Sequence, residues 1–172
     1  MDKVFAEENG VYEIDCTKAL WATDEIHDVY HATGVMIRDA DFLIEETEKM
    51  YLVEYKNANI YHAVNPGAFK PEDDRRLNGV VQKFYDSLHY IYLMGKMKPL
   101  RYVYVLEFPN GDRVIRKRLR NKMKQKLPFE LQDKVGHGRK MIEGVDVVSI
   151  REWNDDKQYS KYPITKRHGE SQ

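Results

Sequence analysis

The sequence predicts an α/β fold in which a central mixed β-sheet is flanked by helices. Three segments carry this prediction: a hairpin-like pair of apolar runs over residues 41–56, a long amphipathic pattern over residues 74–93, and a run rich in β-branched and aromatic residues over residues 100–108. The hairpin runs have apolar groups on both faces, which is typical of strands covered on both sides. We therefore expect a sheet between two layers of helices.

Length and composition indicate a single domain. The chain has 172 residues, of which 42% are apolar and 12% aromatic, enough for one core over about residues 11–153, and the polar tail 154–172 is expected to fray. No run of about 18 apolar residues is present, so membrane-spanning functions are excluded. The N-terminus lacks the layout of a secretory signal, and the single cysteine, Cys16, can form neither an internal disulfide nor a four-cysteine zinc site. These features predict a cytoplasmic protein.

The charges balance in number but are unevenly distributed. Of 28 basic and 28 acidic residues, residues 1–60 hold 5 basic and 14 acidic ones, whereas residues 113–172 hold 16 basic and 8 acidic ones. This gradient is consistent with two faces that attract each other, with a carboxylate-rich site beside a phosphate-binding surface, or with solvated surface charge.

The first expected elements are a strand and a helix. Residues 12–16 alternate apolar and acidic side chains, with the period of a half-buried strand. Residues 23–32 have apolar groups at helical spacing behind a cap signal at Thr23 and Asp24, and Gly34 offers a left-handed stop. A helix start as early as Thr17 remains open.

A β-hairpin closed by residues 46–49 is expected next. With this loop the numbers of opposed residues sum to 95, so Asp41 faces Glu54 and Asp39 faces Lys56 on one face of the sheet. That face also carries Leu43 and Leu52, and the opposite face carries Phe42, Ile44, Tyr51, Val53 and Tyr55.

The rest of the chain is expected to hold a helix over residues 74–93, a strand over 100–108, a loop over 136–140 and a last strand over 145–153. Residues 113–127 admit two interpretations. Apolar residues spaced by four favour a helix capped by Asp112, whereas Asn110 and Gly111 favour a hairpin turn with a second strand after it. We prefer the helix.

Asp41, Glu54 and Lys56 form the constellation with the clearest chemistry. Two neighbouring carboxylates repel each other unless one is protonated or a cation lies between them. Mg²⁺, or Mn²⁺ in its place, suits such a pair because it is held by one or two carboxylates with waters and a phosphate oxygen. Lys56 can contact that phosphate or the attacking water. The structural alternative, a cross-strand ion pair worth under about 1 kcal/mol, fits less well with the apolar neighbours of the pair.

The sequence around these residues reads Asp41-Phe42-Leu43-Ile44-Glu45, a turn, and then Tyr51-Leu52-Val53-Glu54-Tyr55-Lys56-Asn57. It resembles the signature of the PD-(D/E)XK nuclease superfamily, which includes restriction-endonuclease-like and junction-resolving enzymes. The resemblance implies a restriction-endonuclease-like core of helix, three strands, helix and strand. It also implies that Asp41 and Glu54 bind the metal and that Lys56 is the catalytic lysine.

The same resemblance suggests accessory residues. On the helix after the Glu-x-Lys triplet, Gln82 and Tyr85 are candidates on either side of Lys83. An acidic residue from the preceding helix would be Glu25 or Asp28, and Asp39 is a further carboxylate on the predicted face. Only one strand is expected between that helix and the Glu54 strand, so either the strand at residues 12–16 completes the three or the helix is misplaced.

A basic segment is the expected DNA-binding surface. It consists of Arg116, Lys117, Arg118, Arg120, Lys122, Lys124 and Lys126, with Arg139 and Lys140 in the later loop. On a helix these cations would lie above an apolar seam and contact phosphates in a salt-sensitive way. A solvated face or a surface for an acidic protein fits the pattern equally well.

Together these features predict a Mg²⁺-dependent nuclease that hydrolyses DNA phosphodiester bonds. RNA remains open as a substrate, the resemblance makes a homodimer plausible, and no membrane partner is expected. One alternative is a catalytically silent module of the same fold that binds nucleic acid or protein. Another is an interaction protein with acidic and basic faces, in which the ion cluster is only structural.

Overall fold

A computed structural model describes residues 3–59 and 68–167, which form eight strands and five helices. The larger sheet has the order β3-β4-β5-β6-β7, with strands Trp21–Thr23, Phe42–Glu45, Met50–Asn57, Leu100–Glu107 and Ile142–Val148. Its first three strands are antiparallel and its last three are parallel, so the sheet is mixed. A smaller antiparallel sheet has the order β1-β2-β8, with strands Val4–Ala6, Tyr12–Asp15 and Ile164–Lys166. The predicted α/β class with a central mixed sheet is confirmed.

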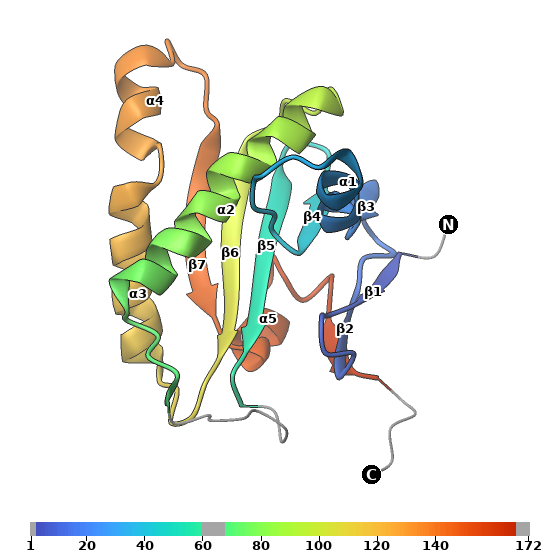
Figure 1. Cartoon of the computed structure of the whole chain (residues 1–172), viewed down its shortest axis with the longest axis vertical. Coiled ribbons are helices and arrows are strands. Elements are labelled where there is room, and N and C mark those ends of the chain that lie inside the picture. Colours follow the sequence, from blue (N-terminus) through green and yellow to red (C-terminus); the bar gives the residue numbers. More distant parts are fainter. Residues whose placement is uncertain (1–2, 60–67, 168–172) are drawn as a thin grey trace.

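The helices are α1 (Ile26–Thr33), α2 (Asp74–Leu93), α3 (Arg113–Lys126), α4 (Phe129–Val135) and α5 (Ile150–Asp155). Figure 1 shows α2 crossing one face of the large sheet beside α3, with α5 on the opposite face. Apolar side chains of α1, α2 and α3 form one core against this sheet. The second core contains residues of α5, β2 and β8, so the other face is covered by a helix and the small sheet rather than by helices alone.

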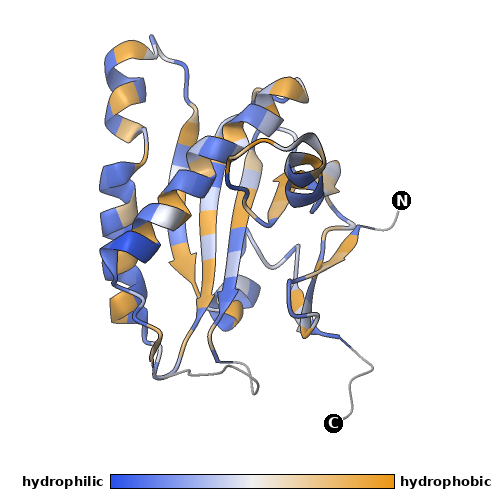
Figure 2. Ribbon diagram, in the orientation of Figure 1, coloured by the Kyte–Doolittle hydropathy of each residue, from blue (hydrophilic) through white to orange (hydrophobic). Residues whose placement is uncertain are grey.

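The hairpin of β4 and β5 has the predicted register. Phe42 pairs with Val53 and Leu43 with Leu52, and the residue numbers of every pair in this hairpin sum to 95. Leu43 and Leu52 lie in the core under α2, whereas Phe42 belongs to the core on the opposite face. The alternation predicted from the loop position is therefore confirmed. In Figure 2 these buried strands are largely hydrophobic, whereas α2 and α3 mix hydrophilic and hydrophobic positions because only one side of each helix is buried.

The elements before the hairpin differ from prediction in their sheet pairing and in the start of the helix. The strand at Tyr12–Asp15 forms, but in the small sheet, and the third antiparallel strand beside the hairpin is β3. Since β3 covers Trp21–Thr23, a helix start at Thr17 is excluded, and the predicted cap at Thr23 and Asp24 is wrong as well. α1 begins at Ile26, with Glu25 as its N-cap. Gly34 ends α1 with φ of 68°, as predicted from its freedom to adopt left-handed backbone.

The predicted last strand over residues 145–153 is wrong in its second half. β7 ends at Val148, and α5 follows because Ser149 and Glu152 form a capping box. The Ser149 hydroxyl accepts a hydrogen bond from the Glu152 N–H at 3.0 Å, and the Glu152 carboxylate accepts one from the Ser149 N–H at 2.9 Å. This local signal outweighs the β-like apolar run.

The fraying predicted after Asn154 is also wrong within the described residues. Tyr159 and Tyr162 are buried, and the Tyr159 ring stacks on Trp153 with centroids 4.6 Å apart. β8 then pairs with β2. Aromatic burial against α5 therefore orders a segment whose composition is polar.

The preferred helix at residues 113–127 is confirmed as α3, with the Asp112 carboxylate accepting a hydrogen bond from the Ile115 N–H at 2.8 Å. The helix at residues 74–93 and the strand at residues 100–108 also form, and α4 was not predicted. Within the ranges that the structure covers, no helix has the length and apolar character needed to cross a membrane.

Candidate active site

Asp41 and Glu54 come together where β4 meets β5. The Asp41 N–H donates to the Val53 carbonyl at 3.0 Å, so the residue before β4 is held against β5 although the paired residues begin at Phe42. The Tyr55 N–H in turn donates to the Asp41 carboxylate at 2.6 Å. Glu54 is 6% exposed and lies in the middle of β5, beside Tyr104 of β6. The hairpin thus holds two carboxylates at neighbouring positions on the face covered by α2.

The environment of this pair disfavours two bare negative charges. Burial raises the pKa of the Asp41 carboxyl, against the opposing effects of Lys83 and the Tyr55 N–H. Burial and then the Asp41 charge raise the pKa of Glu54 well above its usual range. Both shifts have the causes expected of desolvated neighbouring acids, and a nearby cation relieves them.

Lys83 of α2 supplies such a cation. Its ammonium donates to both Glu54 oxygens, at 2.7 and 2.9 Å. Burial lowers the pKa of Lys83, but the Glu54 and Asp41 charges together outweigh it, and the net pKa is raised. Sequence reasoning assigned no role to this lysine. Its spacing in the helix could have marked it. Lys83 follows Val80 by three residues and precedes Ser87 by four, and both of these residues are buried, so the lysine lies beside the buried side of α2.

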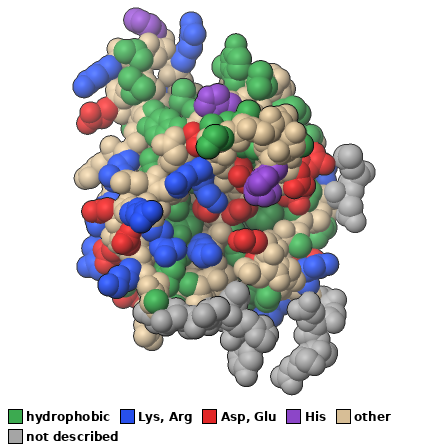
Figure 3. All heavy atoms as spheres, viewed as in Figure 1, with side chains coloured by type: hydrophobic (Ala, Val, Ile, Leu, Met, Phe, Trp, Pro, Cys, Tyr) green, Lys and Arg blue, Asp and Glu red, His purple; other side chains and the backbone are tan. Residues whose placement is uncertain are grey.

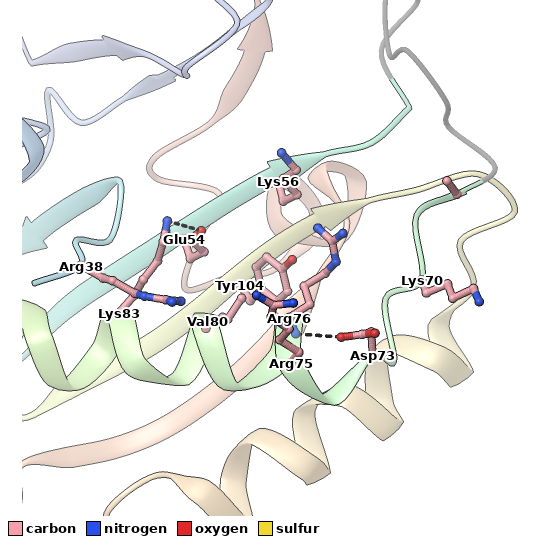
Figure 4. Close-up of a pocket in the computed structure, with 12 residues that line it drawn as sticks. Arg38, Glu54, Lys56, Lys70, Asp73, Arg75, Arg76, Val80, Lys83 and Tyr104 are labelled. Carbon is pink, nitrogen blue, oxygen red and sulfur yellow. Dashed lines mark hydrogen bonds and ion pairs between the residues drawn. The ribbon is translucent and has the colours of Figure 1, made fainter.

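A cavity of about 550 Å³, hereafter the cationic cavity, opens between α2 and the strands at Glu54. Its basic lining residues are Arg38, Lys56, Lys70, Arg75, Arg76 and Lys83. Figure 4 shows Lys83 directed at Glu54, with Lys56 farther along β5 and Arg76 beside Tyr104. Among residues 3–59 and 68–167, only Lys83 of these six pairs with a carboxylate. The cavity therefore presents five cations without an acidic partner in the described chain.

A second cavity of about 400 Å³, the acidic cavity, lies on the other side of Lys83. Its acidic lining residues are Glu7, Glu8, Asp24, Asp28, Asp39 and Asp41. Glu7 is already engaged, since its carboxylate accepts backbone N–H groups of Asn9 and Val11 at 2.8 and 2.7 Å. In Figure 3 basic side chains gather near the centre of the face, and acidic ones lie beside them on the side of α1.

The described residues contain no group of three or more His, Cys, Asp or Glu side chains arranged to hold a metal ion. Protein ligands from this part of the chain would therefore be Asp41 and Glu54 alone. Mg²⁺ accepts this arrangement, because it usually keeps several waters and takes one or two carboxylates together with substrate phosphate oxygens.

The structure places the other predicted site residues as follows. Lys56 lines the cationic cavity and is not paired with Asp39, whose carboxylate lies 3.2 Å from the His27 ring. Asp28 lines the acidic cavity, whereas Glu25 is the N-cap residue of α1 and lines neither cavity.

The two accessory candidates on α2 point elsewhere. The Gln82 amide donates to Asp86 at 2.8 Å, and the Tyr85 hydroxyl donates to the Lys126 carbonyl at 2.8 Å. Both are thus engaged away from the carboxylate pair, and Lys83 between them is the residue that reaches it.

The basic segment of α3 is partly neutralised. Arg116 is 7% exposed and paired with Glu152 at 2.8 Å, so its predicted place on an open cationic face is wrong. Arg118 lies 3.0 Å from Glu72. Among the other predicted DNA-binding residues, Lys122 lies 3.9 Å from Asp74, and Lys124 lies over the Phe129 ring. Arg139 and Lys140 are exposed in the segment after α4. The rest of the predicted set consists of Lys117, Arg120 and Lys126.

Comparisons with known proteins identify no relative. No family model, no curated protein and no solved structure matches this chain. The residues and their geometry alone therefore support any functional conclusion.

Proposed function

We propose that the protein is a Mg²⁺-dependent nuclease that hydrolyses DNA phosphodiester bonds, with Asp41 and Glu54 as metal ligands and Lys56 assisting the attacking water. One observation carries the proposal: the buried Glu54 opens onto a cavity lined by five cations that have no carboxylate partner among the described residues, and Asp41 lies close to it at the adjoining acidic cavity. A carboxylate pair suits a divalent cation, and unpaired cations suit phosphates.

The carboxylates fit a divalent metal ion. Both oxygens of Glu54 already contact an ammonium, and the pKa of each acid is raised by burial. The site therefore favours a bound positive charge even when no substrate is present. When bound there, Mg²⁺ would polarise the phosphate and lower the pKa of a water molecule.

The chain's own residues supply the rest of the chemistry. Lys56 follows Glu54 by two positions on β5, so its side chain has the same face and lines the same cavity. There its ammonium can orient a water molecule toward the phosphorus and neutralise the developing charge on the phosphate. Arg75 and Arg76, in the first turn of α2, can contact neighbouring phosphates at the positive end of the helix. Contacts of this kind fix the position of the strand without reading its sequence.

The topology adds support for a restriction-endonuclease-like core. Three antiparallel strands lead to Glu54, a long helix follows, and β6 then pairs parallel to β5. The implied order of helix, three strands, helix and strand differs in one place, because α1 lies between β3 and β4. The Asp41 and Glu54 strands and the helix after them follow the implied order.

Titration with Mg²⁺ and Mn²⁺ by calorimetry, combined with cleavage assays on plasmid, linear and branched DNA, tests the proposal. We expect Asp41→Asn to lose both metal binding and cleavage, with a fall in rate of about a hundredfold or more, while DNA binding is retained. Lys56→Met should retain metal binding and lose cleavage. Glu130→Gln, an exposed carboxylate of α4, is the matched control and should behave as the wild type. Absence of metal binding in the wild type would refute the proposal.

A catalytically silent DNA-binding module is the second candidate. It is favoured by the Lys83 contact, which already neutralises Glu54 without a metal. This alternative predicts that the wild type does not cleave DNA, and that its DNA binding is unchanged by Asp41→Asn and by removal of divalent cations.

A further inference from the structure

Lys83 separates two cavities of opposite charge. The cationic cavity on one side has six basic lining residues and two acidic ones, Glu54 and Asp73. The acidic cavity on the other side has six acidic residues and only Lys83 and His27 as basic ones. Lys83 is the residue that lines both. A side chain in this place faces a region suited to cations and a region suited to anions.

The contact with Glu54 occupies the oxygens that a metal would need. The Lys83 ammonium lies 2.7 and 2.9 Å from the two Glu54 oxygens, so neither oxygen is free of it. A divalent cation bound to either oxygen would lie next to the ammonium, and two positive charges at such a distance repel strongly at a buried site. Lys83 and a divalent cation therefore compete for Glu54.

The structure also offers Lys83 a second place. Its side chain is 28% exposed and lines the cationic cavity, and a lysine side chain rotates about several bonds. On the side of the cationic cavity it would join Lys56 and Arg76, where a substrate phosphate is the nearest anion that the proposed function supplies.

We propose that Lys83 is an exchangeable cation: it pairs with Glu54 when no metal is present and moves from Glu54 to the substrate phosphate when a divalent cation binds. This inference rests on the metal site of the proposed function. It makes Lys83 a positioning residue that couples the metal ion and the substrate. When the metal ion displaces Lys83 from Glu54, the ammonium becomes available to contact the substrate phosphate. By linkage, substrate then strengthens metal binding by the same factor as metal strengthens substrate binding.

Calorimetric titration with Mn²⁺ tests this inference on the full chain at mildly alkaline pH. Each protein is titrated alone and with a short phosphorothioate oligonucleotide, which resists hydrolysis. The variants are Lys83→Met and, as a matched control, Lys70→Met. Both replace a lysine of the cationic cavity, but only Lys83 contacts Glu54. Thermal unfolding verifies that each variant is folded, and Lys83→Gln replaces Lys83→Met if the latter does not fold.

Without oligonucleotide, we expect Lys83→Met to bind Mn²⁺ about tenfold more tightly than the wild type, because a competing ion pair has been removed. Lys70→Met should match the wild type in Mn²⁺ affinity. Oligonucleotide should strengthen Mn²⁺ binding in the wild type, and this strengthening should be smaller by at least about threefold in Lys83→Met.

Equal or weaker Mn²⁺ binding by a folded Lys83→Met, or an unchanged effect of the oligonucleotide, would overturn the inference. Failure of the proposed function is recognised separately. If no protein binds Mn²⁺, the metal site itself is refuted and the inference falls with it. If the binding pattern is as expected but no DNA is cut, the exchange by Lys83 stands and the nuclease proposal fails.

Discussion

Replacing Lys83 by methionine should destabilise the fold more than replacing its partner Glu54 by glutamine. The two side chains differ in burial, since that of Lys83 is 28% exposed and that of Glu54 is 8% exposed. Without Lys83, a buried carboxylate is left beside Asp41 and must be protonated or remain unpaired. Without the Glu54 charge, the Lys83 ammonium can reach solvent along its flexible stem.

The expected magnitudes follow from this asymmetry. Removing one partner of a fully buried ion pair costs about 3–5 kcal/mol, and the partial exposure of Lys83 reduces the value for Lys83→Met to about 2 kcal/mol. Glu54→Gln should cost about 1 kcal/mol or less, close to the value of an exposed pair. The double variant should be less destabilised than the sum of the two, with an interaction energy of at least about 1 kcal/mol.

The effect should also depend on pH with a defined sign. The pKa of Glu54 is raised in the fold, so ionising it weakens the folded state as pH rises from its unfolded value toward its folded value. Loss of Lys83 removes a group that lowers this pKa. The destabilisation caused by Lys83→Met should therefore be small near about pH 4, the range of an unfolded glutamate, and grow as the pH rises above it.

Urea unfolding of the wild type, both single variants and the double variant measures these energies, provided each transition is two-state with a similar dependence on urea. A larger destabilisation by Glu54→Gln than by Lys83→Met would refute the asymmetry between the two partners. The reasoning is also refuted if the two single changes are additive, or if the effect of Lys83→Met does not increase with pH.

Three further predictions test the cavity and the fold. Gly79→Ala places a methyl group 2.6 Å from the Arg38 guanidinium, which must move, so oligonucleotide affinity in a fluorescence titration should fall about threefold while thermal stability changes little. Ser149→Ala removes the capping box of α5 and should lower the free energy of unfolding in urea by about 0.5–2 kcal/mol. The double change of Arg75 and Arg76 to methionine should reduce the slope of log affinity for single-stranded DNA against log salt by about 1–1.5, which salt-dependent binding isotherms measure.

The features that could be predicted from the sequence are those fixed by short-range chemistry. The register of β4 and β5 follows from the position of one loop, because a slip by one residue would exchange the two faces of the hairpin. α2 follows from apolar residues at threes and fours over 20 residues and from the Asp73 cap. The juxtaposition of Asp41 and Glu54 is a consequence of that register, so the loop position alone locates the centre of the candidate site.

Features that depend on distant segments could not be predicted. β2 pairs with β1 and with β8, so residues near positions 5, 14 and 164 form one small sheet that no local pattern indicates. α5 was missed because the apolar run over residues 145–150 is typical of a strand, and only the Ser149 and Glu152 pair marks the change to helix. Burial of Tyr159 and Tyr162 then depends on α5 being present.

The number of basic residues in a segment of the sequence does not show how many of them are free to bind an anion. In the most conspicuous basic run, in α3, three of the seven basic residues meet acidic partners, Glu72, Asp74 and Glu152, which lie far from the run in sequence. The five unpaired cations of the cationic cavity come instead from the segment before β4, from β5 and from residues around the start of α2, and none of these segments has an unusual composition. What matters for binding an anion is the number of cations left without a partner in one place, because a neutralised cation gains little from a phosphate. That quantity depends on the tertiary structure, and it is the reason why the proposed function assigns the phosphate contacts to the cavity beside Glu54 rather than to α3.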